Sequence, residues 1–321
     1  MTRPVPYLNE EVANRDFKYY IFDWDDNILH MPTKIRMEHK EEDGTWKSVE
    51  VSTSTFALVR TDTDHYRPPT RGGWAEAFRN FADPENDGEP NRFIEDTLAA
   101  LAKVSNGEKP SPSYNTFRKT LIEGRIFAIV TARGHAPATI EKAVRVFIEN
   151  ALTPLERETM MSNLRGYRKF LDKVETFGTD EEELDYYLGM CRYAAVTYDG
   201  FKERMANDPV YKEKLARATT AAKPELAKEF AIRDFVEHVF HMLQRTGGLG
   251  RSVAIGFSDD DKGNVKSVSN YIKSELSRRF DGIKFVVYDT SDRSLSKGRK
   301  VCVSGQMNLP GFSPARYLFM P

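Results

Sequence analysis

The chain has 321 residues, of which 40% are hydrophobic and 30% charged, and its formal net charge is -1. This length is enough for one large domain with insertions or for two smaller domains. The balanced composition excludes a disordered chain and a strongly basic nucleic-acid-binding protein. The two cysteines, Cys191 and Cys302, belong to no Cys-x-x-Cys or Cys/His spacing, so we expect reduced packing residues and no zinc site. The N-terminus lacks the apolar core of a signal peptide and no stretch is long enough to cross a membrane, which predicts a cytoplasmic protein without a membrane partner.

The first informative stretch is an apolar run that ends in carboxylates. Phe17–Phe22 is aromatic and β-branched, and Asp23, Asp25 and Asp26 follow it directly. This pattern is typical of a buried parallel strand that delivers side chains to the carboxyl edge of a sheet, where open α/β sheets bind ligands. Adjacent carboxylates repel one another, so the cluster needs a cation or a shared proton. Asp62-Thr63-Asp64 has the same spacing without a preceding strand, and we interpret it as a chance occurrence.

The segment from about 31 to 91 is too long for a simple connection between a strand and a helix, and we expect a substructure of its own. Lys34–Arg60 alternates polar and apolar residues around a turn, which predicts a β-hairpin. A short helix around Trp74–Phe81 and an exposed loop at Asp83–Asn91 follow. Two interpretations of the hairpin stay open: a lid or docking edge that reads the substrate, and a solvated hairpin whose basic residues balance its acids.

A second apolar strand, Ile126–Val130, ends at Thr131 and is followed by Gly134. A hydroxyl at a strand end, beside backbone amides that can face an anion, is suited to bind a phosphate oxygen; the alternative is a strand that ends in an ordinary turn. Helical spacing predicts helices that cover the sheet at Phe93–Val104, Tyr114–Ile122, Ala136–Leu152 and Pro224–Leu243.

Tyr193–Tyr198 predicts a third strand. The charged segment 201–222 that follows is either a small helical insertion over the site or a solvated face. A proline in the first turn of the next helix places Lys223 at the mouth of that helix.

A further apolar strand, Ser252–Ser258, again ends in adjacent carboxylates, Asp259 and Asp260. If this strand neighbours the first one in a parallel sheet, the two acidic strand ends converge on one hard cation with oxygen ligands, which favours Mg²⁺. A last strand is predicted at Ile283–Tyr288, and 301–321 is assigned as a C-terminal tail.

The order of these segments resembles that of the haloacid dehalogenase superfamily of phosphohydrolases. The matching segments are, in order, Asp23-Trp24-Asp25-Asp26-Asn27-Ile28-Leu29, Ile129-Val130-Thr131, Lys223-Pro224 and Ser258-Asp259-Asp260. Asp26-Asn27 stands where Gly-Thr is usual, and Lys228 is a nearby alternative to Lys223. The resemblance implies an α/β fold with a Rossmann-like parallel sheet, helices on both faces and a hairpin and helical insertion after the first strand. The catalytic domain would span 1–300, with insertions at about 31–91 and 201–222.

The resemblance also implies a mechanism. Asp23 would attack phosphorus to form an aspartyl-phosphate, and Asp25 would act first as general acid and then as general base. Thr131, the backbone of Ala132 and Lys223, or alternatively Lys228, would hold the phosphoryl oxygens.

The metal site implied by the resemblance consists of the carboxylates of Asp23, Asp259 and Asp260 with the backbone carbonyl of Asp25, and its ion is Mg²⁺. The expected substrate is a phosphorylated small molecule, with polynucleotide ends or phosphoproteins as alternatives. A different class of protein also stays open, namely a non-catalytic module that binds magnesium and phosphate.

Overall fold

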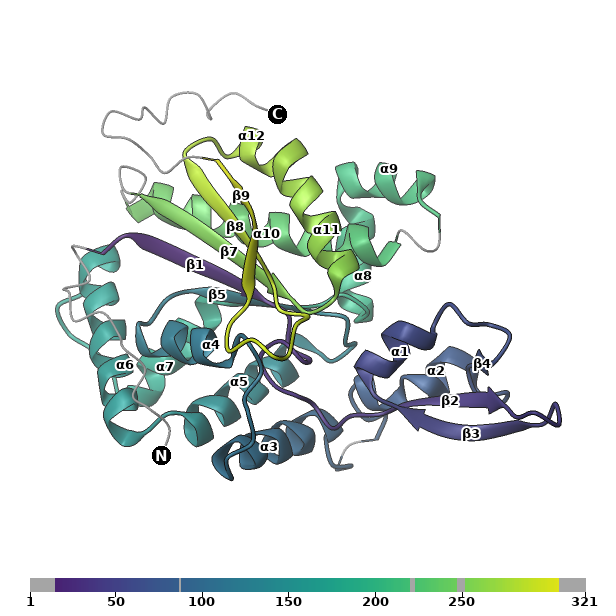
Figure 1. The fold of residues 1–321 in the computed structure, drawn as a ribbon. Helices are drawn as coiled ribbons and strands as arrows, with labels where there is room; N and C mark the ends of the chain where they lie inside the picture. Colours follow the sequence, from purple (N-terminus) through teal and green to yellow (C-terminus); the bar gives the residue numbers. More distant parts are fainter. Residues whose placement is uncertain (1–14, 87, 220–222, 247–251, 306–321) are drawn as a thin grey trace.

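The centre of the fold is a six-stranded sheet in the order β6-β5-β1-β7-β8-β9 (Figure 1). The computed structural model describes residues 15–86, 88–219, 223–246 and 252–305. All strands of this sheet are parallel except β9, which pairs with β8 in the antiparallel direction. The strands are β1 (Phe17–Phe22), β5 (Phe127–Thr131), β6 (Arg192–Ala195), β7 (Val253–Asp259), β8 (Ile283–Asp289) and β9 (Arg299–Ser304). The predicted α/β class with a mostly parallel sheet flanked by helices is confirmed, and this arrangement is compatible with a Rossmann-like fold.

The central strands are apolar because helices cover both faces of the sheet. Every residue of β5 is buried, as is typical of parallel strands between two helical layers. The chain runs outward from β1 to β5 and β6, then returns to the other side of β1 for β7 and β8. Right-handed crossovers therefore place the helices of the two halves on opposite faces. The strand order reverses between β1 and β7, which is the position where such sheets bind ligands.

The predicted helices are present. The larger helices of the main unit are α3 (Arg92–Ser105), α4 (Tyr114–Ile122), α5 (Pro137–Ala151), α6 (Pro154–Tyr167), α7 (Asp180–Met190), α10 (Lys223–Thr246) and α11 (Lys262–Tyr271). Shorter segments are the π-helices Arg168–Asp172 and Ile272–Leu276 and the helix α12 (Ser277–Arg279). In the main core, the ring of Phe117 on α4 packs edge-on against Phe22 of β1 and Phe127 of β5.

The insertion after β1 forms a small unit with its own core (Figure 1). The predicted hairpin is confirmed as β2 (Ile35–Lys40) and β3 (Trp46–Val51), and β4 (Tyr66–Arg67) joins it in the order β3-β2-β4. Its helices are α1 (Thr53–Val59), α2 (Gly73–Ala77) and the 3-10 turn Arg79–Phe81. The small core consists of Ile35, Met37, Val51, Ala77 and Phe81. This separate core explains why the segment between Met31 and Asn91 is long.

The charged segment after β6 is helical and packs on the main unit. It consists of α8 (Asp199–Asn207) and α9 (Pro209–Arg217). Tyr211 is buried, and its ring packs edge-on against the ring of Phe230 on α10. Its hydroxyl donates a hydrogen bond to the hydroxyl of Tyr271 on α11 at 3.2 Å. The expected helical segment is therefore present, and apart from the buried side chains of Phe201, Met205 and Tyr211 most of its residues are exposed. Residues 220–222 lie outside the described part.

The strand β9 was not predicted. The assignment of a tail from residue 301 is wrong for Val301–Ser304, which belong to this edge strand. Only Cys302 of these residues is buried, while Val301 and Val303 face outward, so the apolar alternation is short and weak. Residues 306–321 lie outside the described residues. Both cysteines are free and buried. In the described residues, no helix is long and apolar enough to cross a membrane.

Candidate functional site

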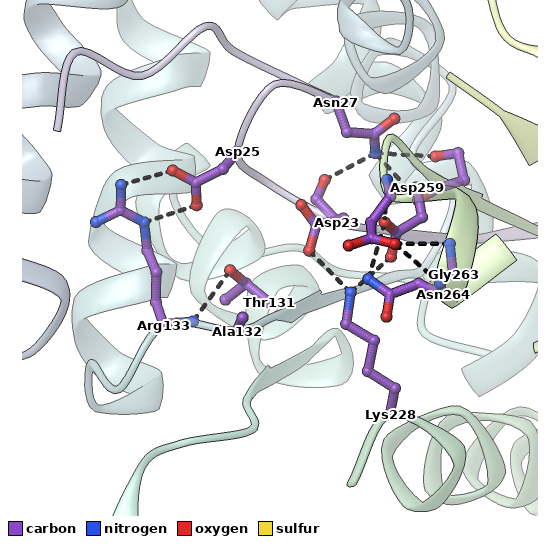
Figure 2. Close-up of polar contacts among 12 residues, drawn as sticks. Asp23, Asp25, Asn27, Thr131, Ala132, Arg133, Lys228, Asp259, Gly263 and Asn264 are labelled. Carbon is purple, nitrogen blue, oxygen red and sulfur yellow. Dashed lines mark hydrogen bonds and ion pairs between the residues drawn. The ribbon is translucent and has the colours of Figure 1, made fainter. Parts of the chain in front are cut away.

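Two acidic strand ends meet at the switch point of the sheet (Figure 2). Asp23 follows the last residue of β1, and its amide donates to the carbonyl of Ser258 in β7 at 3.0 Å. Asp259 is the last residue of β7, and the register pairs Phe22 with Ser258. Asp23 is 6% exposed and Asp259 is 1% exposed. The expectation that these strands are parallel neighbours is therefore met.

A buried lysine lies between these two carboxylates. Lys228 of α10 is 5% exposed, and its Nζ lies 2.6 Å from Asp259 Oδ2 and 3.5 Å from Asp23 Oδ1. Burial by itself would lower the pKa of Lys228, but the charges of Asp259 and Asp23 outweigh it and raise the pKa. The lysine is therefore held as a cation that offsets part of the negative charge of the cluster.

Lys223, the first choice from the sequence, does not reach the carboxylates. It is exposed at the start of α10, whereas Lys228 lies on the buried face of the same helix. The preference for Lys223 is therefore corrected in favour of the alternative, Lys228. The reason is geometric, because five residues rotate the side chain by about 140° around the axis of an α-helix.

The carboxylates around Asp23 are oxygen donors, the ligand type that a hard cation prefers. Burial raises the pKa of Asp23 well above its usual range, Lys228 opposes this shift, and the charge of Asp259 adds to it. Burial and the charge of Asp259 also raise the pKa of Asp260 well above its usual range. Burial and neighbouring carboxylates thus disfavour the ionised form of both carboxyls despite the nearby lysine.

The side chains are not arranged as a complete metal-binding set. Within the described ranges, no three Asp, Glu, His or Cys side chains are placed so that they hold an ion together. Both oxygens of Asp259 have partners, because Oδ2 accepts from Lys228 and Oδ1 accepts from the amide of Asp261 at 2.9 Å and from Asn264 Nδ2 at 3.2 Å. A bound cation would replace some of these contacts.

Asp25 points away from Asp23 and toward Arg133 (Figure 2). Arg133 Nε and Nη2 donate to Asp25 Oδ2 and Oδ1 at 2.8 and 2.7 Å. Arg133 is 1% exposed and lies two residues after Thr131. Sequence reasoning gave Arg133 no role, and no feature of its position in the sequence distinguishes it from other arginines.

Thr131 and Ala132 lie at the carboxyl end of β5. Thr131 is buried, and its hydroxyl accepts from the amide of Arg133 at 3.4 Å. Ala132 is exposed, and its carbonyl accepts from Thr197 Oγ1 at 3.0 Å. The amide of Gly134 donates to the carbonyl of Phe81 at 2.7 Å and so is engaged within the protein.

Asn27 is a second residue that sequence reasoning did not assign. Its side chain is fully buried and joins four segments. Nδ2 donates to the Asp23 carbonyl at 2.8 Å, to the Ser258 carbonyl at 3.2 Å and to Ser258 Oγ at 3.0 Å. Oδ1 accepts from Ser113 Oγ at 2.7 Å and Thr290 Oγ1 at 2.9 Å. The amide thus fixes the exits of β1 and β7 relative to each other.

Asp26 attaches the insertion to this loop. It has a φ of 55°, a left-handed conformation that glycine adopts freely and that Asp and Asn tolerate better than other residues. Its carboxylate accepts from Thr53 Oγ1 at 2.8 Å at the start of α1 and pairs with Arg293 at 2.8 Å and His30 at 2.9 Å. These contacts explain why an acid is useful at a position that favours glycine.

The two described cavities lie away from these residues. One of about 40 Å³ lies at the opposite edge of the sheet, beside Phe17 and Ile126. The other, a groove of about 540 Å³, lies between α9 and α10 and is lined by Lys214 and Glu229 among others. Neither contains a carboxylate of the candidate site.

Comparisons with known proteins give no relative for this chain: no protein-family model, no curated protein and no solved structure matches it.

Proposed function

We propose that this protein is a magnesium-dependent phosphatase of the haloacid dehalogenase type, which hydrolyses a phosphomonoester through an aspartyl-phosphate. The observation that carries the proposal is the placement of Asp23 and Asp259 at the ends of neighbouring parallel strands, with Lys228 between their carboxylates. Open α/β sheets bind ligands at this switch point. A buried cation beside a buried carboxylate gives a nucleophile and an electrostatic partner for a phosphoryl group.

In the proposed reaction, a carboxylate oxygen of Asp23 attacks phosphorus while the bond from phosphorus to the leaving oxygen breaks. Asp25 gives a proton to the leaving oxygen and then takes a proton from the water that attacks the aspartyl-phosphate. This second step releases phosphate and restores the Asp23 carboxylate. Lys228, Thr131 and the backbone of Ala132 bind the phosphoryl oxygens and offset their charge.

Asp23, Asp259, Asp260 and the backbone carbonyl of Asp25 would hold Mg²⁺, which would offset the negative charge of the bound phosphoryl group. The raised pKa values of Asp23 and Asp260 support this assignment, because burial and mutual repulsion leave these carboxyls short of positive charge. We infer that the substrate is a phosphorylated small molecule and that the protein acts in the cytoplasm. Polynucleotide ends and phosphoproteins are the alternative substrates.

A second candidate function is a module that binds magnesium and phosphate without turnover. It is favoured by the arrangement of Asp25, both of whose oxygens accept from Arg133. Each carboxylate oxygen has a second acceptor position, however, so the ion pair orients Asp25 without excluding proton transfer. Turnover is therefore the measurement that separates the two candidates.

The test is the release of phosphate from p-nitrophenyl phosphate in the presence of Mg²⁺. We expect activity that disappears in chelator, falls when Ca²⁺ replaces Mg²⁺, and is abolished by Asp23→Asn, because the amide is no nucleophile. Asp62→Asn is the matched control, since Asp62 is an exposed acid of the Asp62-Thr63-Asp64 triplet, which has the same spacing. Full activity in chelator, or an active Asp23→Asn protein, would show that the proposal is wrong.

A panel of sugar phosphates, nucleotides, phosphopeptides and 3′-phosphorylated oligonucleotides then separates the substrate classes. We expect the highest kcat/KM on small molecules. A preference for the oligonucleotides or phosphopeptides would select the alternative.

A further inference from the structure

Arg133 is enclosed by aromatic rings from both units of the protein. Its guanidinium carbon lies 4.6 Å from the ring centre of Phe81 and 4.5 Å from that of Phe93. Phe81 belongs to the small core of the insertion, whereas Phe93 of α3 belongs to the main core. The guanidinium that orients Asp25 is therefore held between one ring of each unit.

The insertion is connected to the main unit by the segment before β2 and by the segment that begins at the end of the 3-10 turn Arg79–Phe81, and both lie beside this arginine. In the first connecting segment, Thr33 Oγ1 accepts from Arg133 Nη2 at 2.8 Å and donates to Asp96 Oδ2 at 2.5 Å. At the start of the second connecting segment, the Phe81 carbonyl accepts from the amide of Gly134 at 2.7 Å. A shift of the insertion relative to the sheet would therefore act on the residues that surround the guanidinium.

The second connecting segment is fixed to the loop after β5 at further points. Ala82 and Gly134 form a parallel bridge, and Asp83 Oδ2 accepts from the amide of Ala136 at 2.6 Å at the start of α5. Residues 81–83 and 133–136 thus run side by side. Backbone contacts with Gly134 therefore help to hold the ring of Phe81 beside the guanidinium, in addition to side-chain packing.

We propose that Arg133 is a positioning residue that sets the orientation of the Asp25 carboxylate according to the placement of the insertion, which it senses through Phe81 and Thr33. This inference rests on the proposed phosphatase function, because it assigns a role in catalysis through Asp25. It also gives the insertion a role in catalysis, because contacts from the insertion would position Asp25, the residue that transfers the proton.

The magnitude follows from the geometry of proton transfer. A general acid or base has to lie within hydrogen-bond reach of the reacting oxygen, and such catalysis contributes about 100- to 10,000-fold. A carboxylate without its bidentate partner can rotate, and a misplacement of about 1 Å costs about 100-fold. The loss falls on substrates with poor leaving groups, because only these need the proton.

Arg133→Met tests the proposal by removing the guanidinium and retaining an apolar stem between the rings. We expect kcat/KM to fall about 100-fold on an alkyl phosphate and at most about 3-fold on p-nitrophenyl phosphate. In an Asp25→Asn background, the same change should have almost no further effect, because Arg133 acts through Asp25. Arg133→Lys, which keeps the charge and one donor group, should recover part of the alkyl phosphate activity.

Phe81→Leu tests the link to the insertion and also serves if Arg133→Met fails to fold. Its matched control is Phe78→Leu, whose ring packs on Phe56 and Phe81 inside the insertion. We expect Phe81→Leu to lose about 10-fold on the alkyl phosphate, with Phe78→Leu unchanged. Hydrogen exchange at the amides of Asp26 and Ile28, which bond Leu29 and Trp24, should accelerate only in Phe81→Leu.

Several results would overturn the proposal. Equal losses on both substrates in Arg133→Met, or additive losses in the double variant with Asp25→Asn, would mean that Arg133 does not act through Asp25. Equal effects of Phe81→Leu and Phe78→Leu would remove the link to the insertion. Failure of the phosphatase function is recognised separately, by unchanged activity in Asp23→Asn or by no turnover in the wild type. In that case hydrogen exchange alone tests the link between the insertion and the loop that carries Asp25. Unchanged exchange at the amides of Asp26 and Ile28 in Phe81→Leu would then refute the positioning role.

Discussion

Replacement of Asn27 by alanine should destabilise the protein more than the size of the change suggests. The side chain is fully buried and makes five hydrogen bonds, to two backbone carbonyls and three hydroxyls. Some of these groups keep a partner in the variant. The Ser258 carbonyl still accepts from the Asp23 amide, and Ser113 Oγ still lies 3.2 Å from Ser258 Oγ.

Two groups lose the partner that Asn27 provides, namely the Asp23 carbonyl and the Thr290 hydroxyl. A buried polar group left unsatisfied costs about 1–3 kcal/mol, so we expect Asn27→Ala to lower the free energy of unfolding by about 3–5 kcal/mol. Thr290→Val is the graded control, because it removes a single donor and leaves Asn27 Oδ1 bonded to Ser113. Its expected cost is about 1 kcal/mol.

The assay is urea unfolding followed by tryptophan fluorescence, in which the buried Trp24 reports on the loop beside the site. The midpoint should fall while the m-value stays constant, as for a change in stability without a change in the surface exposed. A loss below about 1 kcal/mol for Asn27→Ala, or an equal loss for Thr290→Val, would refute the reasoning that this amide joins β1 to β7.

Three further predictions concern single residues. Lys228→Met should lower the free energy of unfolding by about 3–5 kcal/mol and abolish phosphatase activity, because it leaves buried carboxylates without their cation. Lys223→Met is the control, and the urea and turnover assays should show no change in its stability or its activity. Asp26→Gly removes the strain of a left-handed backbone conformation at this position, but it also removes the hydrogen bond to Thr53. Hydrogen exchange should therefore accelerate in α1 and stay unchanged in β7. Unchanged exchange in α1 would contradict the role of Asp26 in attaching the insertion to the loop after β1. Burial raises the pKa of the Cys191 thiol, so a thiol reagent at pH 8 should label it only after unfolding, and rapid labelling of the native protein would contradict its burial.

The placement of Lys228 changes how the acidic cluster is understood. From the sequence, Asp23 and its neighbours require a cation or a shared proton, and the oxygen ligands favour Mg²⁺ as that cation. The structure supplies one cation from the protein itself, at 2.6 Å from Asp259. The proposal of magnesium therefore rests on Asp23 and Asp260, whose ionised forms are disfavoured by burial and by neighbouring carboxylates and would be stabilised by a cation.

The sequence by itself determined the parallel strands of the main sheet, but not the edge strand β9, and it placed the acidic residues at the ends of β1 and β7. β1, β5 and β7 lie between two helical layers, so their residues form continuous apolar runs that are recognisable without knowledge of their neighbours. The hairpin of the insertion was predictable for a similar reason, because its alternation and its turn at Asp43-Gly44 are local features. The residues that follow a strand are fixed by the chain, so Asp23 and Asp259 had to stand at the carboxyl edge.

Only the tertiary structure decided which partners these residues have. Asp25 pairs with an arginine 108 positions away, and Asp23 lies beside a lysine 205 positions away. Such distant contacts have no local signal in the sequence, since they depend on how the helices and the insertion pack on the sheet. The choice between Lys223 and Lys228 is of this kind: both belong to the first turns of α10, and the orientation of that helix against the sheet selects the one that is buried beside the carboxylates.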